Sequence, residues 1–164
     1  MNKQTVTIEG LNSESFPWPS NFEGRATKFT PEGARSFSIL LSDEQESVLL
    51  GDGWNVKRSK EDEDGISRAY IDIAVSWKFK PPTVVVISDD HRTLLNESTI
   101  GIIDSLDIET MDIIFRPYDY SLPTGSGRKA YLQTMFVTIR QDDLLKKYGF
   151  GAELGRSAAE EASF

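Results

Sequence analysis

Short stretches in which apolar and polar residues alternate recur along the chain, and a period of two residues predicts β-strands with one buried face. The clearest stretch spans residues 70–79, where the odd-numbered residues are apolar and Tyr70, Asp72 and Lys78 lie on the other face. The same pattern predicts further strands at residues 5–8, 36–41, 54–57, 83–87, 111–120 and 129–140. The chain is therefore expected to be mainly β.

Local signals place helices and turns between these strands. Ser42 and Gln45 have the spacing of a capping box, which marks the start of a helix. Helices are predicted at residues 43–50, 96–105 and 142–148, and a turn and a flexible loop at residues 88–92 and 123–127. Because the strands do not alternate with long helices, the pattern favours a barrel or sandwich with helical insertions over a doubly wound parallel sheet.

Composition adds the domain organisation and the expected compartment. The 164 residues suit one domain, and no apolar run approaches the roughly 20 residues that span a bilayer, so no membrane partner is expected. The absence of cysteine excludes disulfides and thiolate metal sites and favours a reducing cytoplasm. We expect a folded domain at residues 1–148 and a flexible acidic tail at residues 149–164, where Gly, Ala, Ser and Glu dominate.

The formal net charge of -8 weighs against a polyanionic partner, since an acidic surface repels phosphate groups. The last 14 residues contain three Glu and one Arg, a net of -2, which leaves -6 for the rest of the chain. A nucleic-acid partner therefore requires that acidic and basic residues lie on different faces of the domain.

Residues that could carry catalysis are sparse. His91 is the only histidine, and it is predicted in a turn with no nucleophile beside it. Residues 61–64 lack the ligand spacing of a calcium-binding loop, and residues 125–129 lack the helix that follows a phosphate-binding loop. The acidic residues between positions 104 and 112 leave a metal-dependent nuclease as an alternative. We otherwise expect no enzyme, no metal and no cofactor.

Aromatic and basic residues share the predicted outward faces of several strands. Proteins that bind single-stranded nucleic acids combine stacking rings with cations that follow the phosphates. The stacking candidates are Phe22, Phe29, Trp54, Tyr70, Tyr118 and Tyr131. The phosphate-binding candidates are Arg25, Lys28, Arg35, Lys57, Lys78, Arg116, Arg128 and Lys129. A core position remains open for Trp54 and Tyr131, since a slip of one residue exchanges the two faces of a strand.

The chain ends in a stretch of small and acidic residues that includes Glu160, Glu161 and Phe164. This ending resembles the tails of bacterial and phage single-stranded DNA-binding proteins, although only two acidic residues are adjacent near its end. The resemblance implies that these three residues recruit replication or recombination proteins, and that the tail competes with DNA for the binding groove. A terminal carboxylate beside an apolar ring also suits a basic, hydrophobic pocket. The alternative is a terminus that ends in Phe without such a role.

Several segments before the tail have sequences that can be compared with known families, namely residues 53–57, 96–101, 116–118, 129–135 and 143–148. With these segments, residues 20–148 resemble a family of tailed-phage single-stranded DNA-binding proteins of similar length. The resemblance implies an OB-like antiparallel β-barrel with two or three short helices and sequence-independent binding of single-stranded DNA. It also implies a role in phage DNA replication or recombination in the host cytoplasm.

A different class of function stays open beside this one. The net charge of -8 favours a protein-interaction or structural module of a phage particle that has no affinity for DNA. The sequence does not decide whether either kind of protein forms a homodimer.

Overall fold

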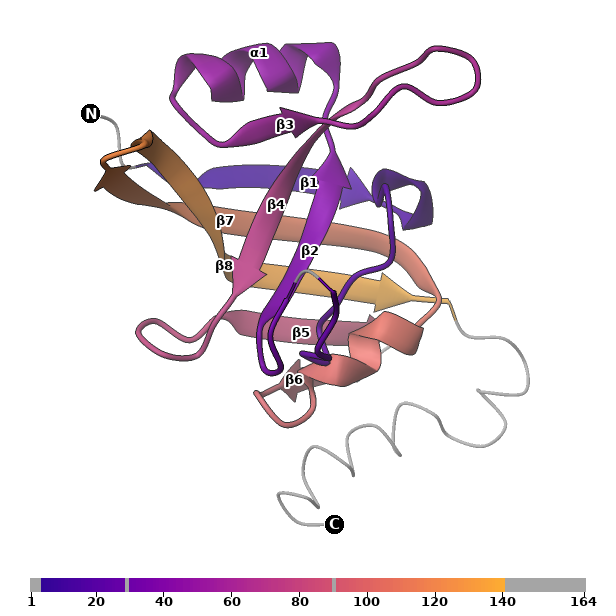
Figure 1. The fold of residues 1–164 in the computed structure, drawn as a ribbon. Coiled ribbons are helices and arrows are strands. Elements are labelled where there is room, and N and C mark those ends of the chain that lie inside the picture. Colours follow the sequence, from indigo (N-terminus) through magenta and orange to yellow (C-terminus); the bar gives the residue numbers. More distant parts are fainter. Residues whose placement is uncertain (1–3, 29, 90, 141–164) are drawn as a thin grey trace.

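A computed structural model describes residues 4–28, 30–89 and 91–140 and shows a fold rich in strands (Figure 1). The strands are β1 (Val6–Leu11), β2 (Arg35–Leu40), β3 (Val56–Arg58), β4 (Ala69–Val75), β5 (Thr83–Ser88), β6 (His91–Leu95), β7 (Ile108–Leu122) and β8 (Gly125–Ile139). The helices are α1 (Asp43–Gly51) and the 3-10 helices η1 (Ser13–Ser15) and η2 (Ile100–Ser105). The prediction of a mainly β fold is confirmed.

The strands form one eight-stranded sheet with a main path β1-β7-β8-β4-β2. β3 pairs with β4, and β5 pairs with β8 and β6. Most pairs are antiparallel, but β8 pairs in parallel with β4 and with β5. The prediction of a wholly antiparallel sheet is therefore wrong. After its hairpin with β7, β8 runs beside β4 and β5, which come much earlier in the chain, and in the same direction as both. No pairing among the described strands joins β1 to β2, so a closed barrel is not confirmed.

The sheet curls so that β2 and β4 cross in front of β1, β7, β8 and β5 (Figure 1). Inward side chains from both layers form one core, which includes Phe37, Phe115 and Met135. Burial alternates along the whole of β4 from Ala69 to Val75, as the two-residue period predicted. The outward side chains of β4 and its neighbours are left for contacts with solvent or a ligand.

β4 is shorter than the sequence pattern predicted. It ends at Val75, so the predicted continuation through Trp77 and Phe79 is wrong. Pro81 and Pro82 follow, and neither has an N–H group to donate to a neighbouring strand. The chain therefore leaves the sheet before the prolines. Trp77 still packs half-buried against the core, whereas Phe79 is exposed.

Residues 88–92, predicted as a turn, contain instead the tight hairpin between β5 and β6. Ser88 pairs with His91 across it, so His91 begins a strand. Asp89 takes the left-handed conformation with φ of 52°, which Asp tolerates better than most residues. The missed strand β6 forms an edge of the sheet, because it pairs only with β5 among the described strands.

β7 and β8 form a long hairpin where the sequence suggested an interruption and a flexible loop. Leu122 pairs with Gly125, so the predicted loop at residues 123–127 reduces to a two-residue turn. β7 also runs unbroken through Pro117. Proline is tolerated there because β1 pairs no further along β7 than Phe115, which leaves that side of β7 without a strand partner.

The predicted helix signals have structural counterparts. The Ser42 hydroxyl accepts the Gln45 N–H at 3.1 Å and the Gln45 side chain accepts the Ser42 N–H at 2.9 Å, which confirms the capping box of α1. The Asn96 side chain accepts the N–H of Ser98 at 2.9 Å just before η2. Within the described ranges, no helix combines the length and apolarity needed to cross a bilayer. The predictions for residues 142–148 and 149–164 lie outside the described residues.

Candidate nucleic-acid interface

The outward side of β4 is the centre of a strip of exposed and half-buried side chains. The register pairs Tyr70 with Lys57 of β3, and Ala74 with Tyr131 of β8. Because β4 and β8 run parallel, Tyr70 lies on the N-terminal side of Ala74 in β4, just as Lys129 lies on the N-terminal side of Tyr131 in β8. We call this strip the aromatic face, and its members are Trp18, Lys57, Tyr70, Asp72, Arg116, Tyr118, Lys129 and Tyr131.

Four of the predicted contact residues lie together at the β7–β8 end of the aromatic face. The rings of Tyr118 and Tyr131 meet edge to face, with centroids 5.8 Å apart. The Arg116 Cζ lies 5.1 Å from the Tyr131 ring centroid and the Lys129 Nζ lies 5.2 Å from it. Tyr118 is 54% exposed. Exposed rings beside cations can stack on bases while the cations contact phosphates, and we call these four residues the tyrosine platform.

A second pair of rings lies at the β3 end of the aromatic face. Trp18 meets Tyr70 edge to face with a centroid distance of 4.6 Å. Lys57 lies beside Tyr70 in the register, and its Nζ donates to the Asp72 carboxylate at 2.9 Å. This hydrogen bond raises the pKa of Lys57 above its ordinary value, although partial burial acts in the opposite direction. Lys57 is therefore a cation at neutral pH whose charge is balanced by a carboxylate.

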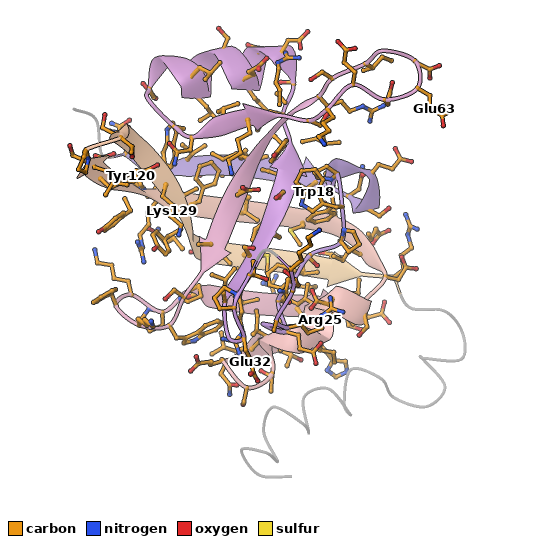
Figure 2. All side chains as sticks on the ribbon, in the orientation of Figure 1. Trp18, Arg25, Glu32, Glu63, Tyr120 and Lys129 are labelled. Carbon is orange, nitrogen blue, oxygen red and sulfur yellow. The ribbon has the colours of Figure 1, made fainter. Side chains whose placement is uncertain are left out.

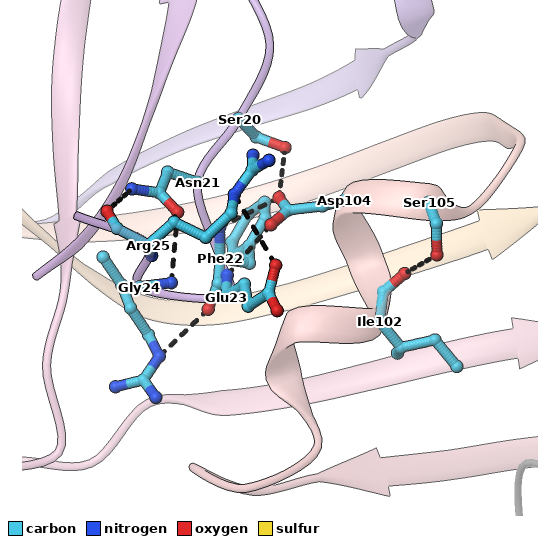
Figure 3. A network of polar contacts seen from close by, with 10 residues as sticks. Ser20, Asn21, Phe22, Glu23, Gly24, Arg25, Ile102, Asp104 and Ser105 are labelled. Atoms are coloured by element: carbon cyan, nitrogen blue, oxygen red, sulfur yellow. Dashed lines mark hydrogen bonds and ion pairs between the residues drawn. The ribbon is translucent and has the colours of Figure 1, made fainter. Parts of the chain in front are cut away.

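The loop that carries Trp18 is fixed by Asp104 of η2 (Figure 3). One oxygen of the Asp104 carboxylate accepts the Ser20 hydroxyl at 2.8 Å and the Phe22 N–H at 2.9 Å. Its other oxygen accepts the Glu23 N–H at 2.9 Å. Asp104 therefore anchors the chain two residues after Trp18, which reduces the freedom of the tryptophan over β4.

The hairpin that carries the tyrosine platform is fixed to the segment before β3. Arg128 donates to the Asp119 carboxylate at 2.7 Å, and its Cζ lies 5.5 Å from the Trp54 ring centroid. The Asn55 side chain accepts the Arg128 N–H at 3.1 Å and donates to the Tyr120 hydroxyl at 3.0 Å. These contacts hold both strands of the hairpin within one network.

Three predicted contact residues are buried, and their assignment to the interface is wrong. Phe22, Trp54 and Arg128 are 0%, 3% and 2% exposed. Phe22 stacks on Phe37 with centroids 5.0 Å apart, and Trp54 meets Phe115 edge to face at 5.0 Å. The reason is tertiary, since Arg128 from the distant hairpin covers Trp54 and core residues from other strands surround Phe22.

Arg35 serves the fold at the start of β2. Its Nε donates to the Phe22 carbonyl at 2.9 Å and its Nη1 lies 3.5 Å from the Glu97 carboxylate. Arg25 is exposed and lies 3.5 Å from the Glu23 carboxylate. Figure 2 shows Arg25 on the side of η2, well separated from Lys129. Neither arginine belongs to the aromatic face.

The other predicted residues divide into two groups. Lys28 and Lys78 are exposed and lie in loops, and Lys78 follows the end of β4. The residues outside the described part of the chain are Phe29, Glu160, Glu161 and Phe164. Their assigned roles stay predictions.

Two exposed aromatic residues were not among the predicted contacts. Trp18 is 42% exposed and Phe79 is 90% exposed. Figure 2 shows Trp18 beside β2 and β4, across these strands from Lys129. A sequence signal existed for both, because Trp18 lies between two prolines and Phe79 lies two residues before a pair of them. Such positions do not suit the interior of a paired strand, so their rings are poor candidates for the core.

Three of the acidic groups are either distant from the tyrosine platform or engaged in contacts within the fold, namely Glu63, Asp104 and Asp112. Figure 2 shows Glu63 at the outer end of the loop between β3 and β4, far from Lys129. Asp112 accepts the Gly10 N–H at 2.8 Å, in addition to the Asp104 contacts above. In residues 4–28, 30–89 and 91–140, no three His, Asp or Glu side chains gather in a way that could hold a metal ion. The nuclease alternative has no supporting observation there.

A family model described as "Putative phage ssDNA-binding domain" matches residues 9–159. The chain belongs to this family of phage single-stranded DNA-binding domains. The match runs from β1 to beyond β8 and so includes every residue of the aromatic face. The family resemblance predicted from the sequence is confirmed. Among curated proteins, none matches the chain.

Solved structures of the single-stranded DNA-binding protein from bacteriophage Enc34 share this fold. The structure in complex with ssDNA has a TM-score of 0.50 at 14% identity over 85% of this chain and 87% of that chain. The C-terminal truncation of the Enc34 protein has a TM-score of 0.50 at 12% identity over 84% and 87%. For gp2.5, the single-stranded DNA-binding protein encoded by bacteriophage T7, the values are 0.43 and 11% over 86% and 89%.

Proposed function

We propose that this protein binds single-stranded DNA without sequence preference across the aromatic face, and that it acts in phage DNA replication or recombination in the host cytoplasm. The tyrosine platform is the observation that supports this most directly. Every base has a π face that can stack on Tyr118 or Tyr131, and Arg116 and Lys129 can contact the phosphates of any sequence. The proposed activity is binding alone, without a metal, a cofactor or a bond-breaking step.

The distribution of charge supports the proposal despite the net charge of -8. Arg116 and Lys129 lie beside the half-buried ring of Tyr131, whereas Glu63 is carried at the far end of a separate loop (Figure 2). Phosphates that approach the platform therefore meet cations at short range. Acidic groups at greater distance are screened at physiological salt, where the Debye length is about 8 Å.

The test is a titration of labelled oligo(dT) by fluorescence anisotropy at low and moderate salt. We expect saturable binding that weakens with salt, and a loss of about fivefold to 150-fold for each of Tyr118→Ala and Tyr131→Ala, the range expected for one stacked base. The matched control is the double variant Tyr118→Phe, Tyr131→Phe, which keeps both rings and should bind nearly as well as the wild type. Unchanged affinity in both alanine variants would contradict the proposed face.

The tail is proposed as a separate functional unit. In this proposal residues 1–148 form an OB-like DNA-binding domain, and Glu160, Glu161 and Phe164 at the end of the tail recruit replication or recombination proteins. An acidic segment tethered to a basic face competes with DNA at a high effective concentration. Removal of residues 151–164 should therefore tighten binding of oligo(dT) at low salt and have less effect at high salt. Equal affinities at every salt concentration would remove the competition from the proposal.

The rival function is a protein-interaction module without affinity for DNA, and one observation favours contact with another chain. β6 pairs only with β5 among the described strands, and Leu94 on it is 64% exposed. An edge strand with an exposed apolar residue can pair with a second copy of the chain and form a homodimer. Light scattering after size exclusion tests this with the wild type and Leu94→Glu. A dimer that Leu94→Glu dissociates, in a protein that does not bind oligo(dT), would favour the rival.

A further inference from the structure

Phe79 is the most exposed large hydrophobic side chain among the described residues. It is 90% exposed and lies in the loop between β4 and β5, between Lys78 and Lys80, which are also exposed. A single exposed apolar residue is ordinary on a protein surface, so exposure alone assigns it no role. The residues around Phe79 are what indicate a ligand contact.

The loop is anchored at both ends, so Phe79 is presented from a fixed base. Before it, Trp77 packs against the core, and the Ser76 hydroxyl accepts the Lys78 N–H at 3.2 Å. After it, Pro82 is buried. Proline has a restricted φ angle, which further limits the motion of the loop.

The loop also contacts the tyrosine platform directly. The Arg116 Nη2 donates to the Lys80 carbonyl at 3.5 Å, and the Cζ of the same guanidinium lies 5.1 Å from the Tyr131 ring centroid. Arg116 therefore lies between the loop that carries Phe79 and one ring of the platform. A strand of DNA whose phosphate contacts Arg116 would pass from Tyr131 toward this loop.

The charges of the loop suit the same ligand. Among the described residues, neither Lys78 nor Lys80 has a carboxylate oxygen within 4.0 Å of its Nζ. Two such lysines on either side of an exposed ring repeat the combination of cation and aromatic ring found at the platform. Single-stranded DNA offers a flat base and a phosphate at every repeat.

We propose that Phe79 is a further stacking residue, which binds a base next to the bases held by the tyrosine platform while Lys78 and Lys80 contact the adjoining phosphates. The inference rests on the proposed function and extends the DNA track from the sheet onto the β4–β5 loop. It assigns Phe79 a contact that only an oligonucleotide long enough to reach the loop can make.

The test compares Phe79→Ala with the wild type on oligo(dT) of about 4 and about 12 nucleotides, a short and a longer length within the range of site sizes of single-strand binding folds. We expect about tenfold weaker binding of the longer strand and little change for the shorter one, if the shorter strand occupies the platform alone. Phe79→Trp should bind the longer strand at least as well as the wild type. Lys78→Gln should lower the slope of log affinity against log salt by about 0.7.

Ile66→Ala is the matched control, because Ile66 is another exposed apolar residue, 48% exposed, in the loop that carries Glu63. It should change neither affinity. If Phe79→Ala binds the longer strand as the wild type does, while Tyr131→Ala binds it weakly, the inference is wrong and the proposed function stands. If the wild type binds neither strand, the proposed function and the inference both fail. Far-ultraviolet circular dichroism of each variant shows that a loss of binding does not come from unfolding.

Discussion

Arg128 donates its Nε–H to the Asp119 carboxylate at 2.7 Å from a position where the arginine is only 2% exposed. Arg116 lies on the paired strand of the same hairpin but has no ion pair with a described residue, and it borders the ring of Tyr131. Both arginines are candidates for phosphate contacts by sequence. The structure gives them different roles, since one holds the hairpin together and the other is available to a ligand.

The first prediction separates these two arginines. Arg128→Ala should lower the free energy of unfolding by about 3 kcal/mol, because it breaks the largely buried ion pair with Asp119 and removes a side chain packed on Trp54. Arg116→Ala should change stability by less than about 0.5 kcal/mol. It should nevertheless lower the salt slope of oligo(dT) binding by about 0.7. Urea denaturation and anisotropy titrations measure the two quantities, and equal losses of stability would contradict the assignment.

The second prediction concerns the close packing of Gly127 inside the hairpin network. A Cβ added at this position would lie 2.5 Å from the Asn55 Oδ1 and 2.5 Å from the Tyr120 hydroxyl. Gly127→Ala should therefore destabilise the protein by about 1–3 kcal/mol, the usual effect of overpacking. Thermal and urea denaturation measure the change.

Gly51→Ala is the matched control for Gly127→Ala. Gly51 ends α1, and an added Cβ there meets nothing within 4 Å. Alanine is favoured over glycine in a helix by roughly 0.5–1 kcal/mol, so this variant should be slightly more stable than the wild type. If both variants were equally stable, the contacts of Gly127 would be looser than the structure indicates.

The third prediction concerns the carboxylate in the aromatic face. Asp72 accepts hydrogen bonds from Lys57 at 2.9 Å and from the Ser38 hydroxyl. Asp72→Asn removes a charge that repels phosphates and releases Lys57 from its ion pair. The affinity for oligo(dT) at low salt should rise about fivefold, which corresponds to one repulsion of about 1 kcal/mol in water. The gain should diminish as salt is added.

Asp64→Asn is the control for the charge change alone, because Asp64 lies in the exposed acidic loop next to Glu63. This variant alters the net charge equally but should have a much smaller effect on affinity. If the two variants gave the same gain, net charge and not the position of Asp72 would govern binding. The route of DNA across the face would then need revision.

The fourth prediction is a dependence of stability on pH. Hydrogen bonds from Arg58 to both carboxylate oxygens of Glu46, at 2.9 and 2.6 Å, lower the pKa of Glu46 below its ordinary value. A carboxyl whose pKa is lower in the folded state stabilises the fold at pH values above its unfolded pKa, roughly 4.3, and loses that effect as pH falls through the folded value. The melting temperature should therefore decrease as the pH drops below about 4.

Acid also acts on the rest of the protein, so the comparison is with Glu46→Gln. This variant cannot lose a charge at position 46, and its melting temperature should fall less steeply with acid than that of the wild type. At pH 7 it should melt at a lower temperature, since the ion pair with Arg58 is absent. Parallel pH curves for the two proteins would show that the pair contributes nothing to stability.

The sequence predicted most of the strands because alternation is a local property. Ile71, Ile73 and Val75 face the core as their period of two requires, and the capping box at Ser42 starts α1 where local hydrogen bonding favours it. The same alternation placed Tyr118 and Tyr131 on one outward face with their cations. Missed features were those where one residue breaks the period, such as the end of β4 before the prolines and the hairpin after Ser88.

What the sequence by itself determined is therefore which side of a strand a residue occupies, together with the composition of the face that carries Tyr118 and Tyr131. Only the tertiary structure decided whether that side is open or covered. Trp54 and Arg128 bury each other although they are distant in the sequence. The neighbouring Asn55 accepts a hydrogen bond from the Arg128 N–H at 3.1 Å across a sequence separation of 73 residues. Phe79 stays exposed although it continues the alternating apolar pattern that begins in β4. Exposure depends on which distant segment packs over a side chain, and local periodicity contains no information about that segment.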